Sequence, residues 1–233
     1  MDTFQKSVYK FIFSLFTSKI IKKKAYKAFK EIAFPFFEEL GSSRNYHYHH
    51  CYTGGLADHT ALVVLDACHS IVSKPWLNID INDMIVVCMF HDLDKVGYYT
   101  GGLKRYSKND IATVDFLENF GLRNNEIQDG VLLIHGGWSR AKVSEHPQIA
   151  VYAHCADMLS SHVAKAQAET RKKIKEIMKE ILKIKYRGTT LNSNCLVCNN
   201  VLDVSSNLEK IKCDECHTIY YVDDKKIIET VGL

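Results

Sequence analysis

Residues 84–92 read MIVVCMFHD, in which seven consecutive apolar residues run directly into a histidine and an aspartate, His91 and Asp92. The apolar run predicts a mostly buried helix over about 82–96. Imidazole and carboxylate groups are costly to bury unless both are satisfied. Neighbouring side chains on a helix project roughly 100° apart, so both can reach one ion at a seam between helices. The pair therefore predicts a metal centre in a helical core.

Two further segments carry groups of the same chemistry. His59 opens an apolar helix expected over about 56–72, and Asp157 lies on a helix expected over about 147–165, with His154 one turn before it. Any one of these histidines is explained at least as well by hydrogen bonding in the core, but the combination favours a metal site. Mixed imidazole and carboxylate ligands suit Mn, Fe, Co, Ni or Zn better than Mg or Ca.

The order of these groups resembles the HD superfamily of metal-dependent phosphohydrolases, which place a His, a His-Asp doublet and a distant Asp on separate helices. Two longer motifs carry the resemblance. Residues 49–60 (HHCYTGGLADHT) are similar to the segment before the first metal histidine in bacterial HD-domain 3′-5′ exoribonucleases. Residues 90–97 (FHDLDKVG) look like the His-Asp-x-x-Lys signature of the family. The resemblance covers about 45–165.

The resemblance implies a helical catalytic domain that holds one or two divalent transition metals. It assigns the metal ligands to His59, His91, Asp92 and Asp157. Asp92 would bridge the ions if two bind, and Lys95 would stabilise charge on the phosphate. The alternative for Lys95 is a solvated lysine at a helix C-terminus, where the helix dipole favours a cation.

The chain departs from the family pattern at two places. Asp94 stands where many relatives have glycine, and His135 is a single histidine where some relatives have two in a row. His135 is the candidate for a second metal, ahead of His154. His49 and His50 are either ligands, donors to ligands, or residues with a helix-capping or structural role.

The net charge of +3 is unevenly distributed along the chain. Residues 1–40 carry eight lysines against four acidic residues, and residues 166–187 carry eight basic against three acidic residues. The stretches 41–165 and 188–233 each have three more acidic than basic residues. The two basic helices either contact a nucleic-acid backbone outside the active site or are the solvated faces of helices packed on the core.

The C-terminal cysteines form two pairs, Cys195-x2-Cys198 and Cys213-x2-Cys216, with 14 residues between them. Two such pairs predict one structural zinc held by four thiolates in a zinc ribbon, and a redox pair is the alternative. A module this small with few large apolar side chains is not expected to fold without its metal. Its acidity argues against unaided binding to a phosphate backbone, and a protein-contact or lid role is the alternative. The other four cysteines are expected to be small core residues.

The expected fold class is mostly α, an HD-domain helical bundle followed by a small β zinc-ribbon module. We expect a basic helical segment over 1–44, helical over about 4–39, then the HD domain with an extending helix over 45–187 and the ribbon over 188–233. No apolar run reaches the ~18 residues of a membrane span, and the first residues lack the features of a secretion signal. These observations predict a cytoplasmic protein with reduced thiols.

The sequence therefore predicts a hydrolase that acts on nucleic acid, like a nuclease, through a metal-activated water. A nucleotide phosphohydrolase acting on mononucleotides or signalling nucleotides is the first alternative, because the acidic balance of the catalytic block fits small substrates as well. The second alternative is a non-catalytic, metal-containing module that binds nucleic acid or protein.

Overall fold

A computed structural model describes residues 1–38, 49–96, 109–139, 146–163 and 166–187 of the N-terminal and central parts of the chain. From the C-terminal part it describes five short stretches, 194–197, 200–202, 210–215, 218–223 and 226–231.

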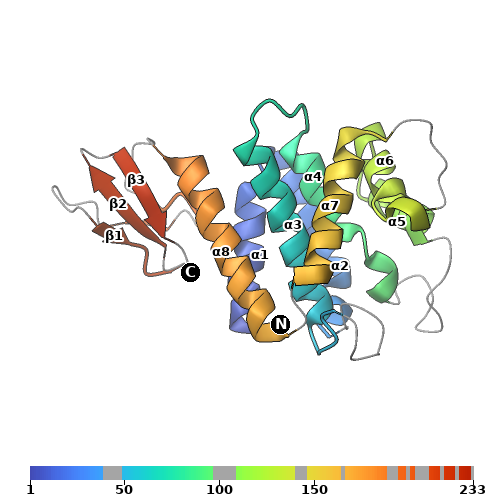
Figure 1. The fold of residues 1–233 in the computed structure, drawn as a ribbon, viewed down its shortest axis with the longest axis horizontal. Helices are drawn as coiled ribbons and strands as arrows, with labels where there is room; N and C mark the ends of the chain where they lie inside the picture. The colour runs from blue at the N-terminus through green and yellow to red at the C-terminus, as the bar shows by residue number, and fades with distance from the viewer. Residues whose placement is uncertain are drawn as a thin grey trace.

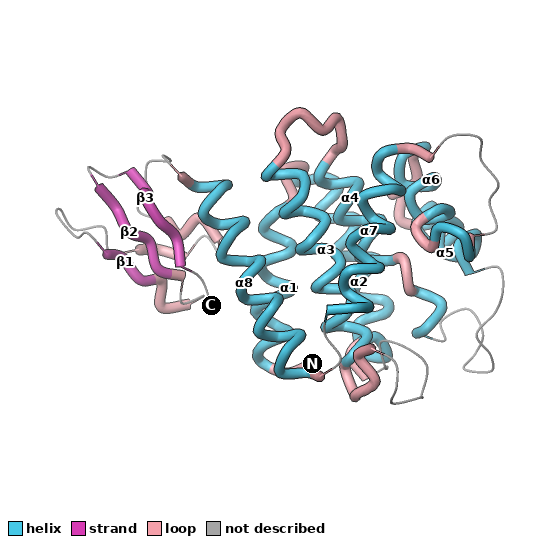
Figure 2. The backbone as a smooth tube through the Cα atoms, viewed as in Figure 1, coloured by secondary structure: helices cyan, strands magenta, loops and turns pink. Residues whose placement is uncertain are grey.

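The described residues are mostly helical, with a small antiparallel sheet near the C-terminus (Figure 2), as the sequence predicts. The α-helices are α1 (Thr3–Leu15), α2 (Lys19–Phe36), α3 (Gly55–Ser73), α4 (Ile81–Phe90), α5 (Asn109–Asn119), α6 (Asn125–Leu133), α7 (Gln148–Val163) and α8 (Gln167–Tyr186). Two 3₁₀-helices are η1 (Leu93–Val96) and η2 (Gly136–Trp138), and the strands are β1 (Lys210–Lys212), β2 (Ile219–Asp223) and β3 (Lys226–Val231).

Helix α3 lies at the centre of the helical part (Figure 1), with α1, α4, α7 and α8 packed against it. Its residues from Gly55 to Leu65 are all buried, including Asp58 and His59. A helix that is buried on all sides must be covered by neighbours on all sides. Polar groups on α3 therefore have to find their partners on the surrounding helices.

The segment expected to be helical over about 4–39, with a break at Pro35, forms two helices, and the break between them lies at residues 16–18 instead. Helix α1 ends at Leu15, and the following residue, Phe16, has an extended backbone with ψ of 128°. The amides of Thr17 and Ser18 then donate to the side-chain oxygen of Asn82, at 2.9 and 3.0 Å. The apolar periodicity continues across this break, which is held by Asn82 on α4 and by the Ser18 hydroxyl, which accepts from the amide of Ile21 at 3.3 Å.

The helix expected over 82–96 is also shorter than predicted. Helix α4 begins after Asp80, whose carboxylate accepts from the amide of Asn82, and ends at Phe90. The chain then turns into η1. His91 and Asp92 therefore lie in the turn between two helices and not in the last half of one, which lets both side chains point to the same side of α4. The helices expected over about 56–72 and 147–165 agree with α3 and α7 to within a few residues where they are described.

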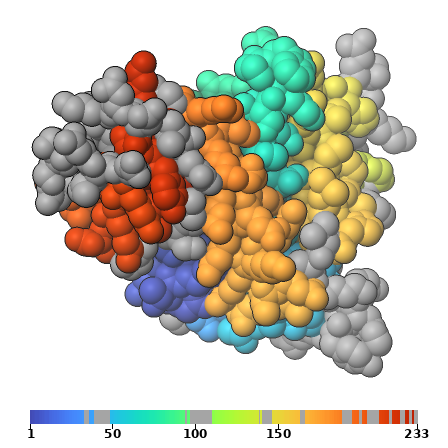
Figure 3. Space-filling model, turned by 60° about the vertical axis from the view of Figure 1, so that its left-hand side comes forward, coloured from blue at the N-terminus to red at the C-terminus, as the bar shows by residue number. Residues whose placement is uncertain are grey.

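The C-terminal sheet has the order β1-β2-β3 with both pairings antiparallel. Tyr220 of β2 is fully buried beneath it, and β3 packs against α8. The Tyr186 hydroxyl at the end of α8 donates to the carbonyl of Leu196, at 3.0 Å. Figure 3 shows α8 as a long ridge between this small module and the central helices.

Within the described residues, none of the helices combines the length and the apolar character that crossing a membrane requires.

Candidate metal centre

His59 enters the centre from the first turns of α3. The preceding Gly54 has φ of +77°, and a Cβ at this position would lie 2.8 Å from Nε2 of Gln5 and 3.2 Å from the carbonyl oxygen of Phe37. Only glycine adopts this backbone without strain and leaves room for Gln5. The Gly54-Gly55 pair thus allows α3 to start against α1, which places His59 in the interior.

His91 follows the buried helix α4, and its ring is held by the backbone. Its Nδ1 lies 2.7 Å from the carbonyl oxygen of Cys88. A carbonyl can only accept, so Nδ1 carries the proton and Nε2 faces the centre. His59 is held from α7, because its Nδ1 lies 2.9 Å from the hydroxyl of Ser160, which can donate or accept. The sequence analysis did not find Ser160, since no spacing relates it to a residue 101 positions earlier.

Four donor atoms from three distant segments converge at this point. His59 Nε2 lies 3.4 Å from His91 Nε2, 3.4 Å from Asp92 Oδ2 and 3.2 Å from Asp157 Oδ1. His91 Nε2 lies 3.3 Å from Asp92 Oδ2 and 3.7 Å from Asp157 Oδ1. Metal–ligand bonds of about 2.1 Å place neighbouring donors roughly 3 to 3.5 Å apart. The spacing and the chemistry of the donors are therefore compatible with one metal ion.

The charges at this point also favour a cation. Burial raises the pKa of Asp92, but Lys95, His91 and His59 outweigh it and hold that pKa well below the usual range. Burial likewise opposes ionisation of Asp157, while bonds to His135, His59 and His91 lower its pKa. Burial lowers the pKa of His91, but the two carboxylates raise it to about 10. Two ionised carboxylates are thus buried together, and they need positive charge beside them.

Lys95 is an immediate neighbour of the centre. Its Nζ lies 2.5 Å from Asp92 Oδ2, and its side chain is 20% exposed. The backbone amide of Lys95 also donates to the carbonyl of Asp92, at 3.0 Å. The lysine is therefore tied to the turn that carries Asp92, with its ammonium at the edge of the buried cluster. The adjacent Asp94 is part of η1.

His135 lies on the far side of Asp157, at the start of η2. Its Nδ1 is 3.8 Å from Asp157 Oδ2 and its Nε2 is 3.7 Å from Asp110 Oδ1. The structure thus places His135 next to the cluster and adds Asp110, which the sequence reasoning missed. No spacing in the sequence connects Asp110 with His135.

His154 has a different environment although it lies one turn before Asp157. Its Nδ1 is 2.6 Å from the carbonyl oxygen of Ile134 and therefore donates to it. Its ring lies against Gly136, which has φ of +56°, and a Cβ on this glycine would come within 2.7 Å of the ring. His154 therefore braces the turn that presents His135.

His49 and His50 lie against His59 on another side, with ring centroids 5.1 and 5.2 Å from that of His59. One donor atom from each of the three lies within 4.8 Å of the others. His50 is fully buried and has φ of 54°, and its Nε2 has no hydrogen-bond partner among the described residues. Burial and neighbouring imidazoles lower the pKa of His49 to about 4 and that of His50 to about 2. Both rings are thus neutral donors or acceptors beside the cluster.

A buried polar network supports the first turn of α3. Asp58, which is 1% exposed, accepts from Gln5 Nε2 at 3.0 Å, from the Tyr52 hydroxyl at 3.2 Å and from Arg171 Nε at 3.0 Å. Arg171 also bonds Asp2 at 2.5 Å. The sequence analysis counted Arg171 only as one charge of a basic helix. In the structure it links α8 to Asp58, the residue before His59.

The C-terminal cysteines are partly described. Cys195 and Cys213 are buried, while Cys198 and Cys216 lie outside the described residues. The amide of Cys195 donates to the carbonyl of Asn200, and that of Cys213 donates to Thr218, at 2.7 and 2.8 Å. The two first cysteines therefore open matching turns with the same five-residue closure. The structural zinc stays a prediction.

In the comparisons with known proteins, the chain matches no family model, no curated protein and no solved structure. What the fold and the site define together is thus a helical protein with a buried cluster of two imidazoles and two carboxylates that is compatible with a metal ion.

Proposed function

We propose that this chain is a metal-dependent phosphoric ester hydrolase of the HD superfamily that acts on nucleic acid. The observation that carries the proposal is the convergence of His59, His91, Asp92 and Asp157, whose donor atoms lie 3.2 to 3.7 Å apart in the pairs named above. They occur along the chain as a His, a His-Asp doublet and an Asp, as in the superfamily. The distances support the motif interpretation independently, because the motif does not determine how far apart the groups lie.

These four residues would hold the ion, and the hydrogen bonds to Cys88 and Ser160 orient the two imidazoles toward it. When bound, a divalent ion supplies Lewis acidity, which lowers the pKa of water and polarises a phosphoryl oxygen. Lys95 keeps Asp92 ionised and places a positive charge at the edge of the cluster, where it stabilises the anionic phosphate.

A second ion would lie beside the first, on the side of Asp157. His135 and Asp110 offer two further donors there, and Asp157 Oδ2 faces His135 while Oδ1 faces His59. Asp157 would therefore be able to contribute to both ions if two bind. Asp92 presents Oδ2 to both imidazoles and to Lys95.

The test is an assay of metal-reconstituted protein on single-stranded oligonucleotides and a panel of nucleotides, side by side. We expect hydrolysis of oligonucleotides that depends on Mn, Fe, Co, Ni or Zn, and that falls by roughly 1,000-fold or more in Asp92→Asn. Replacement of groups that merely orient ligands already costs 10–100-fold. Turnover of free nucleotides alone would support the nucleotide phosphohydrolase. Absence of hydrolysis with a bound metal would contradict the enzymatic proposal.

A further inference from the structure

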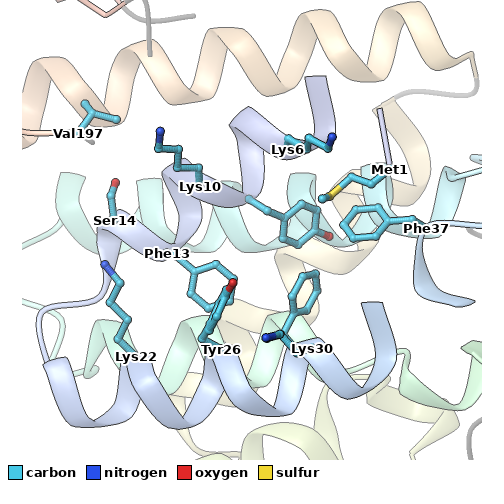
Figure 4. A pocket seen from close by; sticks show the side chains of 12 residues that line it. Met1, Lys6, Lys10, Phe13, Ser14, Lys22, Tyr26, Lys30, Phe37 and Val197 are labelled. Carbon is cyan, nitrogen blue, oxygen red and sulfur yellow. The ribbon is translucent and has the colours of Figure 1, made fainter. Parts of the chain in front are cut away.

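A cavity of about 610 Å³ lies between α1 and α2, apart from the metal cluster (Figure 4). Its volume is in the range of small-molecule binding sites. Five of its lining side chains are aromatic, and these are Tyr9, Phe13, Tyr26, Phe29 and Phe37. The cavity therefore offers an apolar, ring-lined surface on the side of the molecule that carries the N-terminal basic segment.

The aromatic rings form one connected group. Tyr9 stacks on Phe29 with centroids 5.0 Å apart, and Phe13 meets Tyr26 edge to face at 5.3 Å. Four of the five rings are buried, but Tyr26 is 52% exposed and Lys30 lies over its ring at 5.8 Å. An exposed tyrosine backed by other rings offers a flat face on which another planar group can stack.

Four lysines line the same cavity, Lys6 and Lys10 from α1 and Lys22 and Lys30 from α2. Figure 4 shows Lys10 and Lys22 toward one end, and Lys6 and Lys30 toward the other. Lys10 is paired with Glu215 at 2.7 Å. Among the residues that the structure describes, Lys6, Lys22 and Lys30 have no acidic partner. The positive charge is thus spread along the cavity and is mostly uncompensated.

The spread of lysines along the cavity favours some ligands over others. A fatty acid carries one charge at one end and would leave the lysines at the other end without a counter-charge. A single nucleic-acid strand carries a phosphate at every residue and a planar base between phosphates. Grooves that combine lysines with exposed rings bind such strands through phosphate contacts and base stacking. The separation of the lysines therefore favours a strand.

We propose that the cavity between α1 and α2 is a binding site for single-stranded nucleic acid, separate from the metal cluster. It extends the proposed function, because it supplies the strand-binding surface that a nuclease acting on polymers needs. The site has a structural link to the cluster, since the hydroxyl of Tyr9 donates to the carbonyl of Ala57, two residues before His59, at 2.9 Å.

Three other basic residues, one on α2 and two on α8, are less suited to binding a strand because they already have partners. Lys24 donates to the carbonyl of Gly121 at 2.7 Å, and Arg171 is occupied by Asp58 and Asp2. Lys173 lies 3.8 Å from Glu176. The strand site is therefore defined by the lysines around the cavity and not by the total charge of either basic segment.

The experiment measures binding of a fluorescent oligothymidylate of about 12 nucleotides to the full chain in the Asp92→Asn background, which keeps the strand intact. The test variant is Lys22→Glu with Lys30→Glu. The matched control is Lys23→Glu with Lys27→Glu, which makes the same charge change at exposed positions of α2 outside the cavity. Thermal unfolding verifies that both variants remain folded.

We expect at least about tenfold weaker binding in the test variant, and a log–log salt slope reduced by roughly 1.4, since each phosphate contact in a single strand contributes about 0.7. The control should differ from the parent by less than about threefold in affinity. Tyr26→Ala should weaken binding by roughly fivefold or more through lost stacking.

Equal weakening in the test and control variants would overturn the proposal, because it would indicate diffuse attraction to the whole helix. Unchanged binding in the test variant would overturn it as well, and so would stronger binding of oleate or thymidine monophosphate than of the oligonucleotide at the cavity. The proposed function fails separately. If the protein without the Asp92 substitution hydrolyses nothing while the lysine variants still lose the strand, the binding site stands and the enzymatic assignment does not.

Discussion

The metal cluster and the C-terminal module differ in what holds them together, although both are expected to bind metal. His59 lies on α3 itself, Asp157 lies on α7, which packs against α3, and His91 follows α4. Hydrogen bonds to other parts of the fold orient the two imidazoles. The described strands of the C-terminal module are short, and few large side chains are buried among them. The difference indicates that the helical part can fold without its metal, whereas the C-terminal module is expected to need a metal in order to fold.

The largest effect is expected in the C-terminal module. Cys213→Ser should abolish its zinc and unfold it, because structural zinc contributes about 10–16 kcal/mol in small zinc modules. Elemental analysis should show the loss of about one zinc per chain, and limited proteolysis should cut after α8 while α1–α8 survive. The control is Cys68→Ser, at a buried cysteine of α3 far along the sequence from this module, which should keep the zinc. A C-terminal module that stays folded without zinc would contradict the proposed difference between the two regions.

The next effect concerns the cluster. His91→Ala should reduce hydrolysis by roughly 1,000-fold or more and lower metal content there, since a direct ligand contributes more than the orienting groups that account for 10–100-fold. The helical circular dichroism should persist, because the surrounding packing does not depend on the ion. His69→Ala on the same helix as His59, but outside the cluster, is the comparison variant. Full activity in His91→Ala would refute the superfamily assignment.

A smaller effect is expected from the polar network around Asp58, which supports the first turn of α3 next to His59. Arg171→Ala leaves the buried carboxylate of Asp58 without its guanidinium partner, which should lower the free energy of unfolding by about 2–3 kcal/mol. Lys173→Ala removes an exposed pair with Glu176 and should change it by less than about 1 kcal/mol. Urea unfolding measures both. Equal values for the two variants would mean that the Asp58 network does not support α3.

The smallest effect is expected from Ser160. Ser160→Ala removes the partner of His59 Nδ1 and leaves every proposed ligand in place, so metal affinity should fall by about tenfold. Competitive titration with a chelator measures this, with Ser161→Ala as the neighbouring control, because Ser161 bonds only the backbone of α7 at Asp157. An unchanged affinity would show that packing alone orients the imidazole.

Much of this organisation can be predicted from sequence where the signal is local. The apolar run before His91 and the apolar segment after Gly54-Gly55 predict helices that the structure contains, although α4 ends earlier than expected. The small β module expected after the helical part agrees with the antiparallel sheet. The family motif also predicts that the four cluster residues, which lie on different segments, lie close together. The helix predictions depend on residues within one or two helical turns of each other, whereas the grouping of the four cluster residues depends on the order of the motif.

The sequence fails where a partner is distant. The break between α1 and α2 depends on Asn82, the early end of α4 places His91 and Asp92 in a turn, and Ser160 and Asp110 are recognised only in three dimensions. The roles of the lysines on α2 are likewise invisible in a charge count, because Lys24 and Lys22 differ only in which direction they face. Hydrogen bonds between residues far apart in sequence leave no periodic signal.

One feature of α7 has a kinetic consequence. Asp157 and Ser160 are one turn apart on this helix, and both contact the ring of His59, one at each nitrogen. Any displacement of α7 away from α3 lengthens both contacts together, so the imidazole loses its carboxylate neighbour and its orienting hydroxyl in the same event. We expect metal exchange at the cluster to follow the opening of a whole helix and not the loss of ligands one at a time, with a rate that parallels amide hydrogen exchange in α7.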